Sequence, residues 1–130
     1  MPTAEEIVNA YTAAWNEPDD GKRRRLLEAA WDEDGAYTDP QSDVAGREAL
    51  VALIGGMHGQ MPGARIEMTS GVDLHHHKLR FTWRFVSGDG AMTIDGIDFG
   101  ELADDGRLNK IAGFWGQPPA LQRRQAGGAA

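Results

Sequence analysis

Asp39 is the first residue whose type and position could support chemistry, because it stands directly before a proline in the segment GAYTDPQSD at residues 35–43. Proline fixes its own φ and pushes the residue before it into extended geometry, so Asp39 is expected to end a strand. A carboxylate in this position either shapes a turn or points in a fixed direction as a general base. The sequence leaves both interpretations open.

Asp98 is unusual because it lies within the apolar segment IDGIDF at residues 94–99. Successive residues of a strand point to opposite faces, so Asp95 and Asp98 are expected to lie on different sides of the sheet. If Asp98 is the inward-facing residue, burial raises the pKa of its carboxyl group, which is common at functional sites.

Three consecutive histidines, residues 75–77, are the third candidate. His75 and His77 share one face of a strand, a spacing that could supply two metal ligands. The chain has no cysteine, and the one further histidine is His58. We therefore expect no metal site here but a strand start with partly exposed imidazoles. An intermediate possibility is that one histidine lines a pocket as a polar group or proton carrier.

Helices are predicted in the first half of the chain. Thr3 and Glu6 form a capping-box pattern, and the apolar residues that follow recur with helical spacing. Turn residues after Glu17 end this helix. The pattern predicts helices over 3–16, 21–32 and 47–57, and a short strand over 36–39.

The periodicity changes from 3.6 to 2 after Pro62. Leu79, Phe81, Trp83 and Phe85 alternate with polar residues, so they are expected to face the core or an interface. Strands are predicted over 65–72, 75–87, 91–102 and 107–116. Helices followed by long antiparallel strands indicate an α+β protein with a curved sheet around a cavity. We expect one domain over 1–117 and a flexible tail over 118–130.

Composition excludes several classes of function. The chain has 130 residues, 13 basic and 20 acidic, which gives a formal net charge of −7. This balance argues against nucleic-acid binding. The densest basic cluster, residues 22–25, is predicted to be the solvated face of a helix. No apolar run is long enough to span a membrane, and the acidic N-terminus is unlike a signal peptide, so we expect a cytoplasmic protein.

Several motifs together resemble the nuclear transport factor 2-like superfamily and its SnoaL-like and ketosteroid isomerase branches. They are YTAAWN at 11–16, WDEDGAYTDP at 31–40, GREAL at 46–50, DFGEL at 98–102, DGRL at 105–108 and GFWG at 113–116. The resemblance covers about residues 4–116. It implies a cystatin-like conical barrel, in which three N-terminal helices pack on a curved, mostly antiparallel sheet.

The resemblance also implies roles for three residues. Ketosteroid isomerases have a carboxylate base before a proline, and Asp39 matches that position. Their oxyanion donors are a tyrosine of the first helix, which Tyr11 matches, and a protonated aspartic acid before the last hairpin, which Asp98 matches. Tyr11 has an alternative role as a packing residue with its hydroxyl at the edge of a cavity. No cofactor or metal is implied.

The fold hosts both enzymes and noncatalytic binders, so two hypotheses follow. The first is a cofactor-independent isomerase or cyclase that acts on a small apolar carbonyl compound. The second is a module for small-molecule binding or dimerisation. A limonene-epoxide-hydrolase-like site would need an Asp-Arg-Asp cluster, which we cannot assemble from this sequence.

Further side chains are expected to surround the ligand, because the chain has more aromatic surface than a small core requires. The resemblance also implies a homodimer formed through the outer face of the sheet, with Arg80, Thr82 and Arg84 near the interface. The predicted pocket residues are Trp15, Trp31, Tyr37, His75, His77, Trp83, Phe114 and Trp115.

Overall fold

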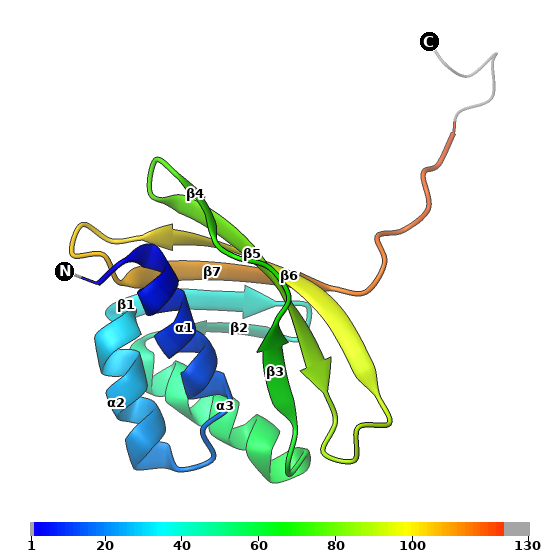
Figure 1. Cartoon of the computed structure of the whole chain (residues 1–130), viewed down its shortest axis with the longest axis horizontal. Helices are drawn as coiled ribbons and strands as arrows, with labels where there is room; N and C mark the ends of the chain where they lie inside the picture. Colours follow the sequence, from blue (N-terminus) through cyan, green and yellow to red (C-terminus); the bar gives the residue numbers. More distant parts are fainter. Residues whose placement is uncertain (1, 124–130) are drawn as a thin grey trace.

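Three helices pack across one face of a curved seven-stranded sheet in a computed structural model that describes residues 2–123 (Figure 1). This arrangement confirms the predicted α+β conical barrel. The helices are α1 (Ala4–Trp15), α2 (Asp20–Ala30) and α3 (Arg47–Gln60). The strands are β1 (Trp31–Asp39), β2 (Ser42–Ala45), β3 (Arg65–Met68), β4 (Asp73–His75), β5 (Lys78–Val86), β6 (Thr93–Leu102) and β7 (Leu108–Trp115).

Helix α1 begins as its sequence predicts, whereas α2 ends earlier than predicted. Thr3 and Glu6 form the predicted capping box. The prediction that the second helix reaches residue 32 was wrong, because Trp31 is extended (φ −125°, ψ 126°) and pairs with Leu108 of β7. Strand β1 is therefore much longer than the predicted 36–39. Its continuation across the Pro40 turn into β2 was not predicted.

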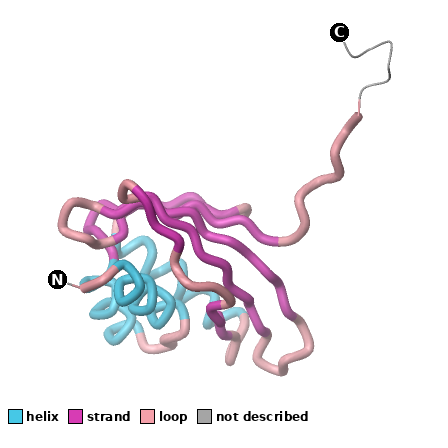
Figure 2. The backbone as a smooth tube through the Cα atoms, turned by 45° about the horizontal axis from the view of Figure 1, so that its top comes forward, coloured by secondary structure: helices cyan, strands magenta, loops and turns pink. Residues whose placement is uncertain are grey.

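The sheet order is β2-β1-β7-β6-β5-β3, with β4 paired to β5. Neighbouring strands are antiparallel except β1 and β7, which are parallel. Figure 2 shows all three helices on the same side of this sheet. Because β1 lies beside β7, and β7 beside β6, the end of β1 is brought close to the middle of β6.

His76 and His77 interrupt what was predicted as one strand over 75–87. His76 and His77 have positive φ angles of 50° and 63° and form the turn between β4 and β5. Two consecutive residues with positive φ match the tight turn that antiparallel hairpins favour. The predicted strand over 65–72 is also shorter, since β3 ends at Met68.

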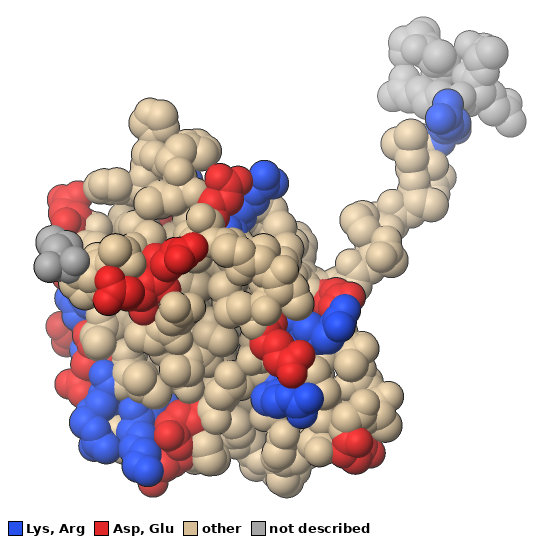
Figure 3. Space-filling view, viewed as in Figure 1, with Lys and Arg blue, Asp and Glu red and all other residues tan. Residues whose placement is uncertain are grey.

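The alternation along β5 separates a buried face from a charged one. Leu79, Phe81 and Phe85 are buried, as predicted. Arg80 and Arg84 are exposed on the other face, where they pair with Asp73 at 2.8 Å and Asp95 at 2.7 Å. Acidic and basic side chains are interspersed over the visible surface in Figure 3. None of the helices within residues 2–123 is long and apolar enough to cross a membrane.

The tail beyond β7 has no helix or strand over residues 117–123. The rest of the predicted flexible tail, residues 124–130, lies outside the described residues.

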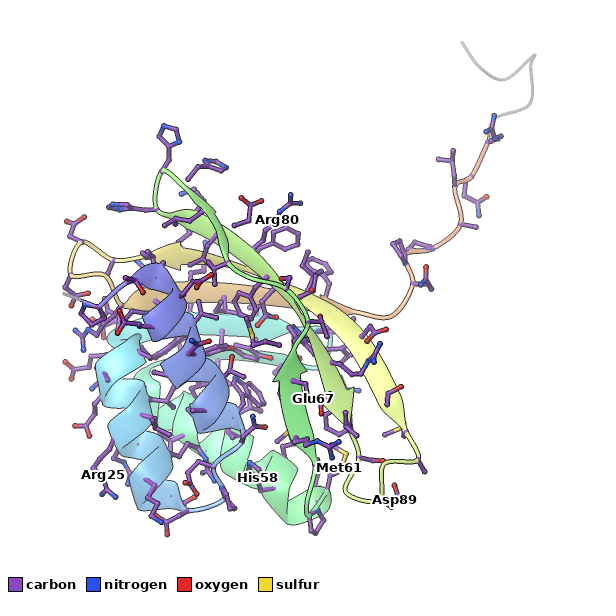
Figure 4. The ribbon with its side chains drawn as sticks, in the orientation of Figure 1. Arg25, His58, Met61, Glu67, Arg80 and Asp89 are labelled. Carbon is purple, nitrogen blue, oxygen red and sulfur yellow. The ribbon has the colours of Figure 1, made fainter. Side chains whose placement is uncertain are left out.

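Arg23 departs from the prediction that residues 22–25 form a solvated face. Its side chain is fully buried, whereas Arg25 is exposed (Figure 4). The Arg23 guanidinium donates to the carbonyl oxygens of Glu17 and Val51 and to the carboxylate of Asp20. These bonds tie α2 to the α1–α2 connection and to α3. The prediction failed because helical spacing does not show which of several adjacent arginines faces a neighbouring helix.

We predict that Arg23→Met lowers the free energy of unfolding by about 2–4 kcal/mol, because the buried carbonyl group of Val51 and the partly buried one of Glu17 lose their donor. Arg25→Met is the matched control and is expected to change it by less than about 0.5 kcal/mol. Urea unfolding followed by circular dichroism measures both. Equal stability of the two variants would contradict the role given to Arg23.

Candidate functional site

A cavity of about 640 Å³ lies between the helices and the concave face of the sheet. It is bordered by residues of α1 and α3 on one side and of β1, β5, β6 and β7 on the other. Asp39, Tyr11 and Asp98 all border it. The structure thus brings together the three residues to which the sequence analysis assigned catalytic roles. Trp15 and Trp115 line this space and do not fill it.

Asp98 is the buried carboxylate of the cavity. It is only 6% exposed, whereas Asp95 on the same strand is exposed and pairs with Arg84 on the outer face. The indole Nε1 of Trp83 donates to Asp98 Oδ1 at 2.9 Å. Burial raises the pKa of Asp98 to about 7; the Trp83 bond opposes this shift and the charge of Asp39 adds to it. The protonated and ionised forms are therefore both populated near neutral pH.

Two glycines make room for the pair formed by Trp83 and Asp98. Gly96 lies directly across from Trp83 in the β5–β6 ladder, and a Cβ atom at Gly96 would overlap the indole ring. Gly113 lies across from Asp98 in the β6–β7 ladder. A Cβ atom at Gly113 would be 2.8 Å from Asp98 Oδ1 and 3.7 Å from the Cβ atom of Asp39. The two aspartates thus approach each other above a residue without a side chain.

Asp39 is half-buried at the end of β1 and is held by two hydrogen bonds. Its Oδ2 accepts from the hydroxyl group of Tyr37 at 2.6 Å, and its Oδ1 accepts from the backbone N–H of Gln41 at 2.8 Å. The second bond is a turn interaction across Pro40, so Asp39 does shape the turn. The same bonds fix the carboxylate at the border of the cavity. Burial raises the pKa of Tyr37 far above its ordinary value, so Tyr37 is a neutral donor.

Tyr11 extends from α1 into the core beneath the cavity. It is 2% exposed, stacks on Trp31 with ring centroids 5.6 Å apart, and meets Phe81 edge-on. Its hydroxyl group has no hydrogen-bond partner among the described residues. Burial, with a further contribution from the charge of Asp98, raises the pKa of Tyr11 well above its usual value, and the nearby Trp15 side chain partly opposes this rise. The neutral hydroxyl is therefore free to bond with a ligand.

Aromatic rings form much of the cavity wall, and four predicted pocket residues are among them. Trp15 and Tyr37 lie 5.5 Å apart between centroids, and Trp83 and Trp115 lie 6.3 Å apart. Each pair stands beside one carboxylate, since Tyr37 bonds Asp39 and Trp83 bonds Asp98.

The other four predicted pocket residues lie away from the cavity. Trp31 is completely buried in the core behind Tyr11. Phe114 is 58% exposed on the outer sheet face against Phe99. His75, at the end of β4, and His77, in the turn between β4 and β5, are both exposed. The predicted single strand over 75–87 did not include this turn. Within residues 2–123 no group of three or more His, Cys, Asp or Glu side chains is arranged to hold a metal ion.

Sequence reasoning missed the part of the wall that comes from α3 and the β1–β2 turn. The third helix was predicted over 47–57, and the helical spacing of its apolar residues Leu53 and Met57 was the signal that could have indicated a ligand site. Nothing in the sequence indicated that Gln41 and Ser42 border the same space. The missed residues at this end include Gln41, Ser42, Leu53, Met57, Gln60 and Met61.

We predict that stability depends on pH through Asp98. Its pKa in the folded protein exceeds the ordinary value of 3.8, so the folded state keeps a proton that the unfolded state loses. The stabilisation is complete below about pH 4 and is lost as pH rises toward 7, by at most about 1.4 kcal/mol per pH unit. Asp98→Asn removes this dependence.

Chemical unfolding at about pH 5, 6 and 7 measures the effect, with Asp95→Asn as the control. Arg84 lowers the pKa of Asp95, so this control alters the pH dependence only at more acidic pH. A wild-type protein and an Asp98→Asn variant with parallel stability profiles would show that Asp98 is not desolvated.

Known proteins with the same fold identify the family. The sequence model described as a SnoaL-like domain matches residues 8–111. A candidate isomerase of the SnoaL-like family from Agrobacterium tumefaciens is 35% identical, with a TM-score of 0.79 over 85% of this chain and 95% of that one. No curated protein matches the chain significantly.

More distant structures agree in fold alone. A protein of unknown function with a cystatin-like fold from Methylobium petroleophilum has a TM-score of 0.75 at 14% identity, over 94% of this chain and 81% of its own. A candidate SnoaL-like polyketide cyclase from Jannaschia has a TM-score of 0.65 at 14% identity, over 84% of each chain. The extent of the family match and the 35% identical structure show that the chain belongs to the SnoaL-like family.

Proposed function

We propose that the protein is a cofactor-independent acid/base enzyme, an isomerase or cyclase, that acts on a small apolar carbonyl compound. The observation that carries this proposal is that two carboxylates with different surroundings, Asp39 and Asp98, border one aromatic-walled cavity. When two carboxyl groups in one site have different surroundings, their pKa values can differ, so that one group acts as a base and the other as an acid. The 35% identical candidate isomerase of the SnoaL-like family supports the same class of reaction.

Asp39 is the proposed base. Its carboxylate takes a proton from the carbon next to the carbonyl group, and the electron pair of that C–H bond moves to form an enolate. The negative charge develops on the carbonyl oxygen. Return of the proton from Asp39 to another carbon completes an isomerisation, whereas attack of the enolate carbon on an electrophilic carbon of the same molecule closes a ring.

Asp98 and Tyr11 are the proposed donors to the developing oxyanion. Trp83 already donates to Asp98 Oδ1, so the proton of the neutral acid is placed on Oδ2. The Tyr11 hydroxyl has no partner within the described part of the chain and is free to donate. Burial keeps Asp98 protonated at a pH at which an exposed aspartate is ionised, although it loses its proton above about pH 7, whereas Tyr11 is neutral throughout this range.

A binding module without turnover is the second candidate function. The observation that favours it is that both Asp39 oxygens already accept hydrogen bonds, from Tyr37 and from the backbone of Gln41. A carboxylate held in this way serves the turn whether or not it accepts a substrate proton. The two candidates differ in whether a bound ketone exchanges its carbon-bound hydrogens.

Naphthyl methyl ketone tests this difference, because its methyl hydrogens are next to a carbonyl group and its rings suit an aromatic-walled cavity. In deuterium oxide, we expect the protein to accelerate deuterium exchange at this methyl group, measured by proton NMR. Asp39→Asn is expected to reduce the acceleration by about 100-fold or more, because the base is lost. Asp43→Asn is the control, since Asp43 is exposed on β2 and lies opposite Thr38.

The pH dependence of the same exchange tests the role of Asp98. The rate is expected to fall above about pH 7, where Asp98 loses the proton that it donates. Asp98→Asn, whose amide donates at every pH, should remove this fall. Acceleration that persists in Asp39→Asn would eliminate the proposed base, and binding of the ketone without exchange would favour the binding module.

A further inference from the structure

The charges around the cavity are of one sign. Asp39 and Asp98 border it, and none of the described residues along its wall is a lysine, arginine or histidine. The two arginines of β5 point to the opposite face of the sheet, where Asp73 and Asp95 neutralise them. Figure 4 shows Arg80 on the side of the sheet away from the helices. An anionic group that entered the cavity would meet the carboxylate of Asp39, and above about pH 7 also that of Asp98, without a basic partner.

Aromatic rings stand beside each of these carboxylates. Tyr37 and Trp83 use their polar edges to bond Asp39 and Asp98, and each packs with a second ring, Trp15 or Trp115. The faces of aromatic rings carry negative electrostatic potential and attract cations, most strongly at tryptophan. Ring faces and carboxylates in one cavity therefore both favour a positively charged ligand.

Tyr11 provides an independent sign that the cavity holds a polar ligand. It is 98% buried, borders the cavity, and none of the described groups hydrogen bonds with its hydroxyl oxygen. A buried hydroxyl group without a partner is costly, and a ligand that donates an N–H group to it would remove that cost. An ammonium group has three such donors and no acceptor.

We propose that the cavity is a binding site for protonated amines carried on a hydrophobic ring system. The ring packs against the aromatic walls, and the ammonium group lies near Asp39 and Asp98 with the Tyr11 hydroxyl as an acceptor. The cavity binds such cations more tightly than neutral compounds of the same shape and excludes carboxylates. This inference uses the cavity of the proposed function but does not depend on turnover there.

Three ligands with the same ring system and different charges provide the test. They are naphthylethylamine, which is cationic at neutral pH, naphthyl methyl ketone, which is neutral, and naphthylacetate, which is anionic. Isothermal titration calorimetry at pH 7.5 and low ionic strength measures their affinities. We expect the amine to bind at least about tenfold more tightly than the ketone, and naphthylacetate to show no binding.

Variants assign the selectivity to this cavity. Asp98→Asn and Asp39→Asn are each expected to reduce the preference for the amine and to permit naphthylacetate to bind, with Asp95→Asn unchanged because Asp95 lies on the outer face. Trp115→Leu keeps both charges but removes one ring face, so it should weaken the amine more than the ketone. This variant also serves if an aspartate variant does not fold.

Equal affinity for the amine and the ketone, or binding of naphthylacetate to the unmodified protein, would overturn the proposal. So would an amine preference that survives both aspartate substitutions. The outcome is separate from the proposed enzyme activity. Deuterium exchange of the ketone without a preference for the amine would support the proposed enzyme activity and contradict amine binding. A preference for the amine without exchange would support amine binding and contradict the enzyme activity.

Discussion

Trp83 on β5 donates its indole N–H to Asp98 on the neighbouring strand β6. This bond requires glycine at two adjoining positions of the sheet. Gly96 provides the space for the ring, and Gly113 provides the space for the carboxylate. An aspartate among apolar strand residues is costly to bury when it is ionised and much less costly when it is protonated and hydrogen-bonded. The bond therefore allows Asp98 to face the cavity although it lies among apolar strand residues.

The order of the strands then brings a second carboxylate to the same place. The parallel pairing of β1 with β7 aligns Thr38 with Ala112, so that Asp39 follows next to Gly113 and close to Asp98. A proline ends β1 at this point, and the turn that it forms binds Asp39 through the backbone of Gln41. The turn and the site are consequently parts of one structure. Helices α1 and α3 close the cavity on the other side and supply Tyr11 and Met57.

The fold was largely predictable from the sequence, because its signals are local. The capping box at Thr3, the alternation along β5 and the turn after Asp39 each follow from a few adjacent residues. Failures occurred where distant contacts decide the outcome. Trp31 belongs to a strand because it pairs with β7, and Arg23 is buried because α3 lies beside α2.

The candidate site shows the same division. The resemblance to ketosteroid isomerases selected Asp39, Tyr11 and Asp98, and the structure places all three at one cavity. The pocket residues that were predicted because they are aromatic or histidine were only partly correct, since four of the eight do not line the cavity. Phe114 differs from Trp115 only in which face of β7 it occupies, and His75 ends β4 while His77 lies in the turn that follows. The absence of basic residues from the wall could be recognised only once the lining was known.

A titration of the aspartate side-chain carboxyl carbons by carbon-13 NMR tests the central claim, that Asp39 and Asp98 share one desolvated cavity. We expect Asp98 to titrate near pH 7 in the unmodified protein, and Asp39→Asn to lower its pKa because the neighbouring charge is removed. A pKa for Asp98 close to 3.8 would contradict its burial. A pKa near 7 that is unchanged by Asp39→Asn would contradict the shared cavity.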